Sequence, residues 1–248
     1  MKLYGLIGYP LEHSSSPDFF HRKFEKEGIH DADYCLFPIK EITELPRLVA
    51  EHPDLSGFNV TSPYKQAILP YLTRTDNAAD TIGAVNTVRV VRENGQTELH
   101  GYNTDYIGFA ESLMERLPRT PKRALVLGTG GGARAVAYAL TGLHTEVTFV
   151  SRTQGRNALT YRDLTAEIVE DNQLIVNATP LGMHPAPDGC PDFPYEWLTN
   201  RHFLYDLIYN PVETEFLRRG RVRGADTCNG LSMLYLQAEA AWSLWRSQ

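Results

Sequence analysis

Short apolar runs alternate with amphipathic segments along the whole chain. The runs end in Gly, Asn or Pro, and the segments between them repeat their apolar residues with the period of a helix. This alternation is typical of βα units assembled around a mainly parallel sheet. The hydrophobic pattern therefore predicts an α/β protein.

The positions of these runs predict two successive series of elements. The first series has strands at 2–8, 34–37, 57–60, 85–91 and 97–101 and helices at 17–27 and 42–50. Its last two strands flank Glu93-Asn94-Gly95, and Asn-Gly favours the positive φ angles of a tight hairpin turn. The second series has strands at 123–127, 146–150, 172–179 and 203–208 and helices at 106–117 and 135–140.

The boundary between the two series falls near Asn103 to Asp105. We therefore expect one domain at 1–104 and a second at 105–228. The C-terminal segment, 229–248, repeats Leu, Ala and Trp at helical spacing and is apolar around most of its circumference. A helix of that kind must be buried, and we expect it to return to the first domain.

Composition narrows the class of partner. The chain of 248 residues has 24 Lys and Arg against 30 Asp and Glu, a net charge of -6, and 42% hydrophobic residues. This balance excludes intrinsic disorder, because a disordered chain lacks the apolar residues needed for a core. The sequence has no Lys/Arg-rich run, so we expect no nucleic-acid and no membrane partner. Small molecules are the expected partners, and the chain is expected to be a monomer or homodimer.

The sequence also indicates a compartment. No apolar run reaches the roughly 18 residues of a spanning helix, and the N-terminal run is too short for a signal peptide. Cys35, Cys190 and Cys228 lie far apart, without the spacing of a zinc site or the density of a disulfide framework. We therefore expect a cytoplasmic protein without a metal site.

A glycine-rich turn opens the second series. The apolar run 124–127 is followed by Gly128-Thr129-Gly130-Gly131-Gly132-Ala133 and then by a helix former's composition. In a strand, turn and helix of this kind, backbone N–H groups and the helix N-terminus can meet a pyrophosphate, and Ala133 allows close helix packing. Glycine turns also end strands that bind nothing, but this context favours a dinucleotide.

The residues after the next strand indicate which dinucleotide. An NAD-binding unit usually has an acidic residue about twenty positions on, whereas this chain has Ser151, Arg152 and Thr153, followed by Arg156. A guanidinium cannot accept a bond from the ribose but can pair with a 2′-phosphate, so the pattern favours NADP. The alternative is that Arg152 is a solvated loop charge. Only eight residues separate Arg152 from Tyr161, too few for a full crossover helix.

Four polar segments of the first series stand where strands are expected to end. They are 8–17 (GYPLEHSSSP), 57–65 (GFNVTSPYK), 83–87 (GAVNT) and 101–105 (GYNTD). Ligands of α/β sheets bind beyond the carboxyl ends of strands, so these segments are expected to converge on one polar pocket. Its hydroxyls, amides, ammonium and carboxylate would suit a polyhydroxylated acid.

In this order, the four segments resemble the shikimate dehydrogenase family. The resemblance continues through the glycine turn, the Ser-Arg-Thr segment, 177–183 (NATPLGM), 206–211 (DLIYNP) and 229–238, and so covers nearly the whole chain. It implies an N-terminal α/β substrate domain, a Rossmann-like NADP domain and a C-terminal helix that returns to the first domain. The implied reaction is NADPH-dependent reduction of 3-dehydroshikimate to shikimate, in chorismate and aromatic amino acid biosynthesis.

The resemblance also implies roles for individual residues. Ser14 and Ser16 would bind the substrate carboxylate. The ring hydroxyls would be held by Thr61, Lys65, Asn86, Asp105 and Gln237, with Tyr209 near the pocket. NADP would contact Gly128, Gly130, Gly131, Gly132, Ala133, Ser151, Arg152, Thr153, Arg156, Leu207 and Gly230. Lys65 and Asp105 would be the catalytic pair, because hydride delivery to a ketone needs a cation and a proton at the oxygen.

The chain departs from the family pattern at a few positions. Phe20 and His21 stand where His and Asn are usual, which affects local helix packing. Ser151 stands where Asn is usual and weakens the expected grip on the 2′-phosphate, and Ser62 replaces an aliphatic residue. The shortened crossover after Arg152 could leave the adenosine end of the cofactor more exposed.

Simpler interpretations of the same residues remain open. Ser14 and Ser16 could cap the helix that begins near Pro17, because Ser is a good N-cap and Pro a good first residue. Asn86 could be a turn residue, Gln237 a core amide with satisfied hydrogen bonds, and Lys65 a solvated lysine. Two rival functions are an NAD-dependent quinate dehydrogenase and a catalytically silent sensor that binds the acid or the nucleotide.

Overall fold

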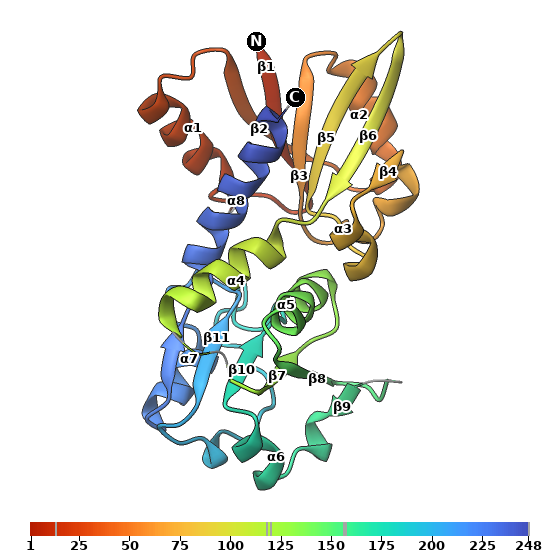
Figure 1. The fold of residues 1–248 in the computed structure, drawn as a ribbon. Helices are drawn as coiled ribbons and strands as arrows, with labels where there is room; N and C mark the ends of the chain where they lie inside the picture. Colours follow the sequence, from red (N-terminus) through yellow and green to blue (C-terminus); the bar gives the residue numbers. More distant parts are fainter. Residues whose placement is uncertain (13, 118, 120, 156–157, 248) are drawn as a thin grey trace. The chain divides into compact units, whose positions relative to one another are not determined.

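The computed structural model describes residues 1–12, 14–117, 119, 121–155 and 158–247. The chain forms two compact units, one made of Met1–Thr104 with Gln237–Gln248 and the other of Asp105–Leu236. Each unit contains a six-stranded sheet flanked by helices (Figure 1), so the predicted α/β class is confirmed.

The sheet of the first unit is mixed. Its strands run in the order β2 (Ala32–Pro38), β1 (Lys2–Gly8), β3 (Leu55–Val60), β5 (Thr87–Glu93), β6 (Gln96–Tyr102) and β4 (Arg74–Thr75). Strand β5 is antiparallel to both of its neighbours, whereas the other pairs are parallel. The carboxyl ends of β1, β2, β3 and β6 therefore meet the start of β5 at one edge of the sheet.

Both faces of the first sheet are covered by apolar side chains. The helices of this unit are α1 (Ser16–Glu27), α2 (Leu45–Glu51), α3 (Asn77–Ile82) and the C-terminal part of α8 (Leu231–Arg246). On one face Phe58, Val60 and Val88 pack with Leu45 and Val49 of α2. On the other face an aromatic cluster joins the sheet to α1 and α8. Figure 1 shows these two helices beside β1 and β2.

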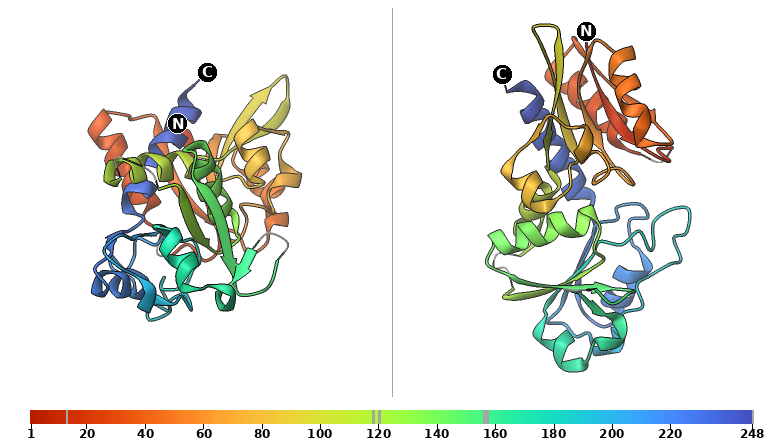
Figure 2. Two further views of the ribbon diagram at one scale, coloured as in Figure 1. Left: turned by 60° about the horizontal axis from the view of Figure 1, so that its bottom comes forward. Right: turned by 90° about the vertical axis from the view of Figure 1, so that its right-hand side faces the viewer.

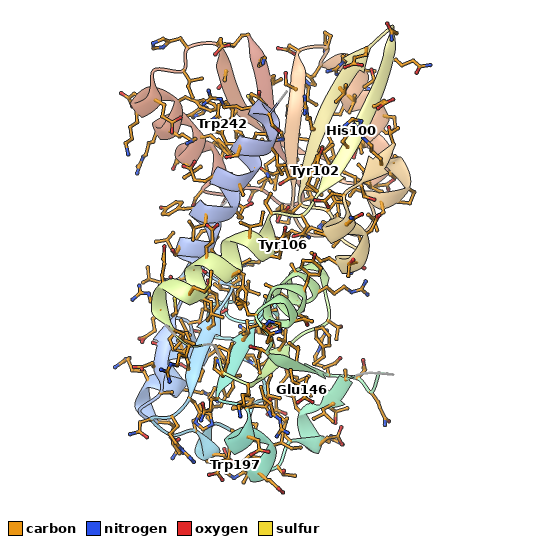
Figure 3. All side chains as sticks on the ribbon, in the orientation of Figure 1. His100, Tyr102, Tyr106, Glu146, Trp197 and Trp242 are labelled. Carbon is orange, nitrogen blue, oxygen red and sulfur yellow. The ribbon has the colours of Figure 1, made fainter. Side chains whose placement is uncertain are left out.

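Helix α8 takes part in the cores of both units. Met233, near its start, belongs to the core of the second unit, and this explains why residues up to Leu236 group with that unit. Trp242 and Trp245 pack in the aromatic cluster of the first unit (Figure 3 labels Trp242). Trp245 also donates from Nε1 to the carbonyl oxygen of Val88 at 2.9 Å. The apolar composition of the segment thus reflects burial in both units. The expected return to the first unit holds for residues from Gln237 on, whereas the start of the helix packs in the second unit.

The sheet of the second unit is entirely parallel. Its strands run in the order β12 (Asp226–Cys228), β11 (Phe203–Asp206), β10 (Leu174–Asn177), β7 (Arg123–Leu127), β8 (Glu146–Ser151) and β9 (Ala158–Thr160). Strand order reverses at β7. The strands that follow it in the sequence lie on both of its sides, with β8 and β9 on one side and β10, β11 and β12 on the other. In doubly wound sheets a ligand binds at this switch point, beyond the carboxyl ends of the strands.

Helices cover both faces of the second sheet. They are α4 (Asp105–Arg116), α5 (Gly131–Gly142), α6 (Ala166–Asp171) and α7 (Glu215–Val222). The core on one face includes residues of α4 and α5, and the core on the other includes residues of α6 and α7. The right-hand view of Figure 2 shows this sheet with α5 above it and α6 below it.

The predicted strands and helices are present, although some of their ends differ. The helix expected at 42–50 begins as a 3₁₀ turn, Ile42–Glu44, before α2. The strand expected at 172–179 ends at Asn177, because the Asn177 side chain accepts from the backbone N–H of Thr179 at 3.1 Å and turns the chain. Asn94 and Gly95 have φ angles of 52° and 77°, as the predicted hairpin turn requires. Residues 152–157 join β8 to β9, and the described ones among them are not helical.

Candidate active site

Four loops meet at the carboxyl edge of the first sheet. The segments that the sequence singled out are joined by backbone hydrogen bonds: Thr61 N–H to Ile7 O (2.9 Å), Tyr9 N–H to Ser62 O (3.3 Å), Val85 N–H to Lys65 O (2.7 Å) and Asn86 N–H to Tyr102 O (3.1 Å). The loops after β1, β3 and β6 and the segment before β5 therefore form one polar surface. Thr61 and Lys65 are both partly exposed on it.

Three serines stand at the start of α1, which begins at Ser16. Ser15 occupies the N-cap position but makes no side-chain capping bond, and Ser14 Oγ accepts from the backbone N–H of Ser16 at 3.3 Å. All three serines are partly exposed. Ser14 thus serves the start of the helix, and its hydroxyl hydrogen can still point to a ligand, because a hydroxyl both donates and accepts.

Asn86 lies at the centre of a buried cluster of polar side chains. Its Oδ1 accepts from the backbone N–H of Thr104 at 2.6 Å, and its Nδ2 donates to Thr104 Oγ1 at 3.0 Å. Nδ2 also lies 3.3 Å from Oε1 of Gln237, on α8. Asn86 and Thr104 are 2% and 0% exposed. The sequence could not show whether the amides of Asn86 and Gln237 are structural or bind a ligand. In the structure the two amides are hydrogen-bonded to one another, and the bonds to Thr104 fix the orientation of Asn86.

The two proposed catalytic residues belong to different units. Lys65 lies in the loop after β3 of the first unit, and its carbonyl accepts from Val85. Asp105 begins α4 of the second unit and is 5% exposed. A carboxylate in the first turn of a helix is favoured by the helix dipole. Because Thr104 is bound by Asn86, the residue immediately before Asp105 is held in place.

The glycine turn of the second unit has the geometry that a pyrophosphate needs. Gly128 has a φ of 109°, and a Cβ there would lie 3.2 Å from the carbonyl oxygen of Ala178, so the position requires glycine. Gly130 precedes α5 without a side-chain cap. A Cβ at Gly130 or Gly132 would meet nothing within 4 Å. The space beside these two glycines is therefore open, which leaves room for a phosphate near the start of α5.

The segment after β8 presents the residues expected near the adenosine ribose. Ser151 ends the strand, and its Oγ accepts from the backbone N–H of Thr153 at 3.3 Å. Arg152 is exposed. Burial raises the pKa of Tyr161 to about 12, while the charge of Arg152 acts to lower it. Arg156 lies outside the described residues.

The remaining residues expected at the cofactor follow β11 and β12. Leu207 N–H donates to Asn177 O at 3.0 Å, and Gly230 N–H donates to Ile208 O at 3.1 Å. A Cβ at Gly230 would lie 2.2 Å from the carbonyl oxygen of Leu207, so this glycine allows the two backbones to meet. Tyr209, expected near the substrate, is partly exposed in the same loop.

A buried carboxyl, that of Asp206, lies at the carboxyl edge of the second sheet. The sequence pattern assigned it no role. Asp206 is 0% exposed and accepts from Thr214 Oγ1 (2.6 Å), Asn177 Nδ2 (3.1 Å) and the backbone N–H of Ile208 (3.0 Å). Burial raises its pKa to about 6, although these three donors act to lower it. The signal in the sequence was an acidic residue at the end of an apolar strand. Its partners are too far away along the chain to be recognised there.

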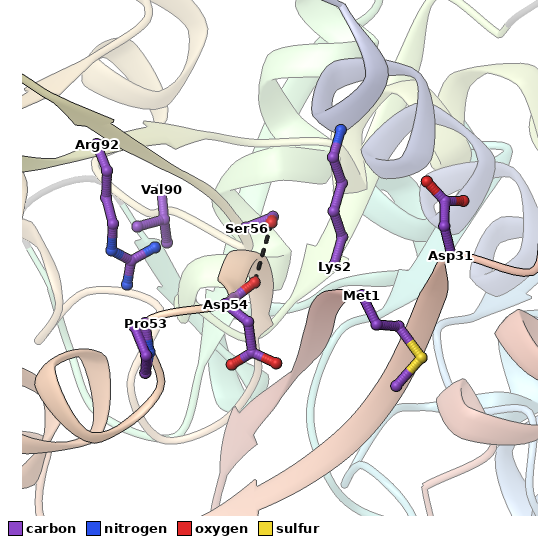
Figure 4. A pocket seen from close by; sticks show the side chains of 8 residues that line it. All are labelled: Met1, Lys2, Asp31, Pro53, Asp54, Ser56, Val90 and Arg92. Carbon is purple, nitrogen blue, oxygen red and sulfur yellow. Dashed lines mark hydrogen bonds between the residues drawn. The ribbon is translucent and has the colours of Figure 1, made fainter.

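A separate hollow lies at the opposite end of the first sheet. It has a volume of about 390 Å³, and its lining includes Lys2, Asp54 and Arg92 (Figure 4). Arg92 donates to the carbonyl oxygens of Val49 and His52, at 3.2 and 3.0 Å, and so caps the end of α2. This hollow is a structural feature of the strand starts and lies away from the loops at the carboxyl edge.

Two other kinds of feature are absent from the part of the chain that the structure describes. Within the described part of the chain, no group of three or more His, Cys, Asp or Glu side chains is placed to hold a metal ion. No helix among the described residues is both long enough and apolar enough to cross a membrane.

The fold and its two polar edges define a class of protein. A parallel sheet with a glycine turn at its switch point, combined with a second α/β unit, is the architecture of a two-domain dinucleotide-dependent dehydrogenase. A family model described as the shikimate dehydrogenase substrate binding domain matches residues 6–88. The shikimate dehydrogenase (NADP(+)) of Desulforamulus reducens is 38% identical, over 97% of this chain and 88% of its own length. The chain belongs to the shikimate dehydrogenase family.

Solved structures show the same fold. The shikimate 5-dehydrogenase of Thermus thermophilus, in complex with NADP(H) and shikimate, has a TM-score of 0.86 at 32% identity and covers 99% of this chain and 94% of its own. The quinate dehydrogenase of Corynebacterium glutamicum, in complex with NAD, has a TM-score of 0.85 at 28% identity, with coverages of 99% and 93%. The fold is therefore common to enzymes named for two substrates.

Proposed function

We propose that this protein reduces 3-dehydroshikimate to shikimate with NADPH, as a step toward chorismate and the aromatic amino acids. The observation that carries the proposal is the cluster of Asn86 and Thr104, both buried, with the partly exposed Gln237. It lies at the sheet edge to which the loops of Ser14 and Lys65 also belong. Membership of the shikimate dehydrogenase family supports the same reaction.

The substrate is held by its carboxylate and its hydroxyls. Ser14 and Ser16 donate to the carboxylate, whose negative charge strengthens each hydrogen bond. The ring hydroxyls are bound by Thr61, Lys65, Asn86, Asp105 and Gln237, with Tyr209 near the ring. Amides suit hydroxyl groups because each amide offers both a donor and an acceptor.

The second unit holds the cofactor. Bound NADPH supplies the hydride that reaches the ketone carbon. The N–H groups at the start of α5 bind the pyrophosphate, where Gly130 and Gly132 leave open space. Arg152 pairs with the 2′-phosphate, while Ser151, Thr153, Leu207 and Gly230 complete the contacts. Arg156 has the same proposed role as Arg152.

Lys65 and Asp105 complete the chemical step. As the new C–H bond forms at the ketone carbon, the π bond to oxygen breaks, and the oxygen, now negative, takes a proton from the ammonium of Lys65. Asp105 orients that ammonium and relays a proton through the neighbouring substrate hydroxyl. Lysine loses one proton in each reduction and recovers it from solvent through this relay.

Three further expectations belong to this proposal. The division of labour between the units is substrate binding at 1–104, together with the C-terminal helix, and NADP binding at 105–228. The protein works in the cytoplasm. It is a monomer or a homodimer.

Product identification tests the proposal. The purified chain is incubated with NADPH and 3-dehydroshikimate, and the products are identified by nuclear magnetic resonance. The proposal predicts one shikimate for each NADPH consumed. Stable NADPH and unchanged 3-dehydroshikimate would instead favour a silent sensor, for which Lys65 and Asp105 have no chemical task.

A further inference from the structure

A line of buried polar side chains crosses the first sheet beneath the proposed substrate site. It consists of Tyr34 on β2, Asn59 on β3 and Thr87 at the start of β5, which are 1%, 6% and 0% exposed. Tyr34 belongs to the aromatic cluster on the α1 and α8 face. Neighbouring strand residues such as Phe58 and Val88 pack on the opposite face, so Asn59 and Thr87 point to the same side as Tyr34.

These side chains are connected in one direction. Tyr34 Oη donates to Asn59 Oδ1 at 2.8 Å, and Asn59 Nδ2 donates to Thr87 Oγ1 at 3.1 Å. Thr87 Oγ1 donates in turn to Asn86 Oδ1 at 3.2 Å. Asn59 Nδ2 also lies 3.2 Å from the carbonyl oxygen of Asn86. The series therefore ends at the side chain and the backbone of a residue proposed to bind substrate.

Tyr34 itself is held at the other end of the series. Burial raises the pKa of the Tyr34 phenol above its ordinary value, and this effect outweighs the smaller lowering by the Ser16 hydroxyl. The net direction is upward, so the phenol stays protonated and remains a donor to Asn59. Phe20 stacks on the Tyr34 ring at 4.2 Å between centroids and 14° between planes. The position of the ring is thus fixed from one side.

We propose that Tyr34 is a positioning residue for the substrate. Through Asn59 and Thr87, its phenol holds the side chain and the backbone of Asn86. The amide proposed to bind a ring hydroxyl is thereby kept in a fixed orientation. This inference rests on the proposed function, because that function assigns Asn86 to the substrate.

Two matched variants of the full chain test the role of Tyr34. Tyr34→Phe removes only the phenolic oxygen. Tyr195→Phe removes a comparable phenol from the second unit, where Tyr195 is 7% exposed and donates to Pro191 O at 3.1 Å. Each variant loses a buried hydrogen bond, so both should unfold at a lower temperature.

The two variants should differ in substrate affinity. Tyr34→Phe should raise the KM for 3-dehydroshikimate about fivefold, the effect of one ordinary hydrogen bond, and leave the KM for NADPH and kcat within twofold. Tyr195→Phe should change none of these constants. Combined with Asn86→Ala, Tyr34→Phe should add less than its separate effect, because Tyr34 acts on the substrate through Asn86.

Each outcome has a definite meaning. An unchanged KM in Tyr34→Phe, or equal increases in both tyrosine variants, overturns the positioning role while the proposed function stands. If Tyr34→Phe fails to fold, Thr87→Val replaces it. The same increase in the KM for 3-dehydroshikimate is then expected, and an unchanged KM again overturns the positioning role. An unmodified protein that leaves 3-dehydroshikimate unreduced overturns both the function and the role.

Discussion

The backbone N–H of Thr104 donates to Asn86 Oδ1 at 2.6 Å, and both residues are buried. This bond ties the start of β5 to the end of β6 and fixes the residue immediately before Asp105. A side chain proposed to bind substrate therefore also orients the backbone that leads into the proposed catalytic carboxylate. Substrate binding and active-site geometry are linked through one amide.

Replacement of this amide should affect both stability and binding. Asn86→Ala leaves the buried Thr104 N–H without its acceptor, which should lower the free energy of unfolding by about 1–3 kcal/mol. The KM for 3-dehydroshikimate should rise by at least tenfold. Denaturant unfolding and steady-state kinetics measure the two effects.

A buried amide elsewhere provides the control for this variant. Asn172, which is 6% exposed, donates to Ile168 O at 2.7 Å in the second unit. Asn172→Ala should reduce stability in a similar way but leave KM unchanged. If the two variants have the same kinetics, Asn86 is only a structural amide.

The choice of cofactor should depend on Arg152. Arg152→Asp removes a charge-assisted pair with the 2′-phosphate and places a like charge against it. The KM for NADPH should rise by two orders of magnitude or more, while the KM for NADH changes little. Equal kinetics of the variant and the unmodified protein with NADPH would mean that Arg152 is a solvated loop charge.

Asp206 should make stability depend on pH in an unusual direction. Its folded-state pKa is about 6, above the roughly 3.9 of an unfolded aspartate. Between these two values the folded state binds more protons than the unfolded state, so stability must fall as the pH rises through that window. The loss should reach about 2–3 kcal/mol and then level off.

Asp206→Asn removes this titration and keeps the side-chain shape. Denaturant unfolding at about pH 4.5 and about pH 7 should show the variant gaining stability relative to the unmodified protein as the pH rises. Asp163→Asn is the control, because Asp163 is exposed and its pKa is lowered. A difference between Asp206→Asn and the unmodified protein that is the same at both pH values would contradict the assignment.

The proton donor should be Lys65. Lys65→Ala should lower kcat by about 10²–10⁴, the usual effect of losing a general acid, with a much smaller change in substrate affinity. Asp105→Asn should also lower kcat, and the double variant should be little worse than either single one, because paired groups act as a unit. Near-normal kcat in Lys65→Ala at saturation would assign the proton to solvent or to Tyr209.

The fold was largely predictable because its signals are local. Apolar runs located the strands, Asn94-Gly95 located the hairpin, and the glycine turn located the start of α5. The short elements were missed because they have only weak local signals. In α7, Phe216 and Leu217 are buried among arginines, and α3 has only six residues, begun by an Asp76 side chain that accepts from the Ala79 N–H.

The candidate site was predictable only as a set of segments. The sequence showed which loops carry polar residues. The order and direction of the strands then place these loops at one edge of the sheet. The contacts of Tyr34 with Asn59, and of Asp206 with Asn177, join residues 25 and 29 positions apart. Strand order determines which of these residues meet, and strand order cannot be predicted from a local sequence pattern.

The most direct test of the central claim compares four reactions of the unmodified protein. Values of kcat/KM are measured for 3-dehydroshikimate and for 3-dehydroquinate, each with NADPH and with NADH. We predict that 3-dehydroshikimate with NADPH exceeds every other combination by at least tenfold, because the proposed role of Arg152 is to select the phosphate and that of the paired serines, with Asn86, is to select the acid. Equal or greater kcat/KM for 3-dehydroquinate with NADH would contradict it and identify a quinate dehydrogenase.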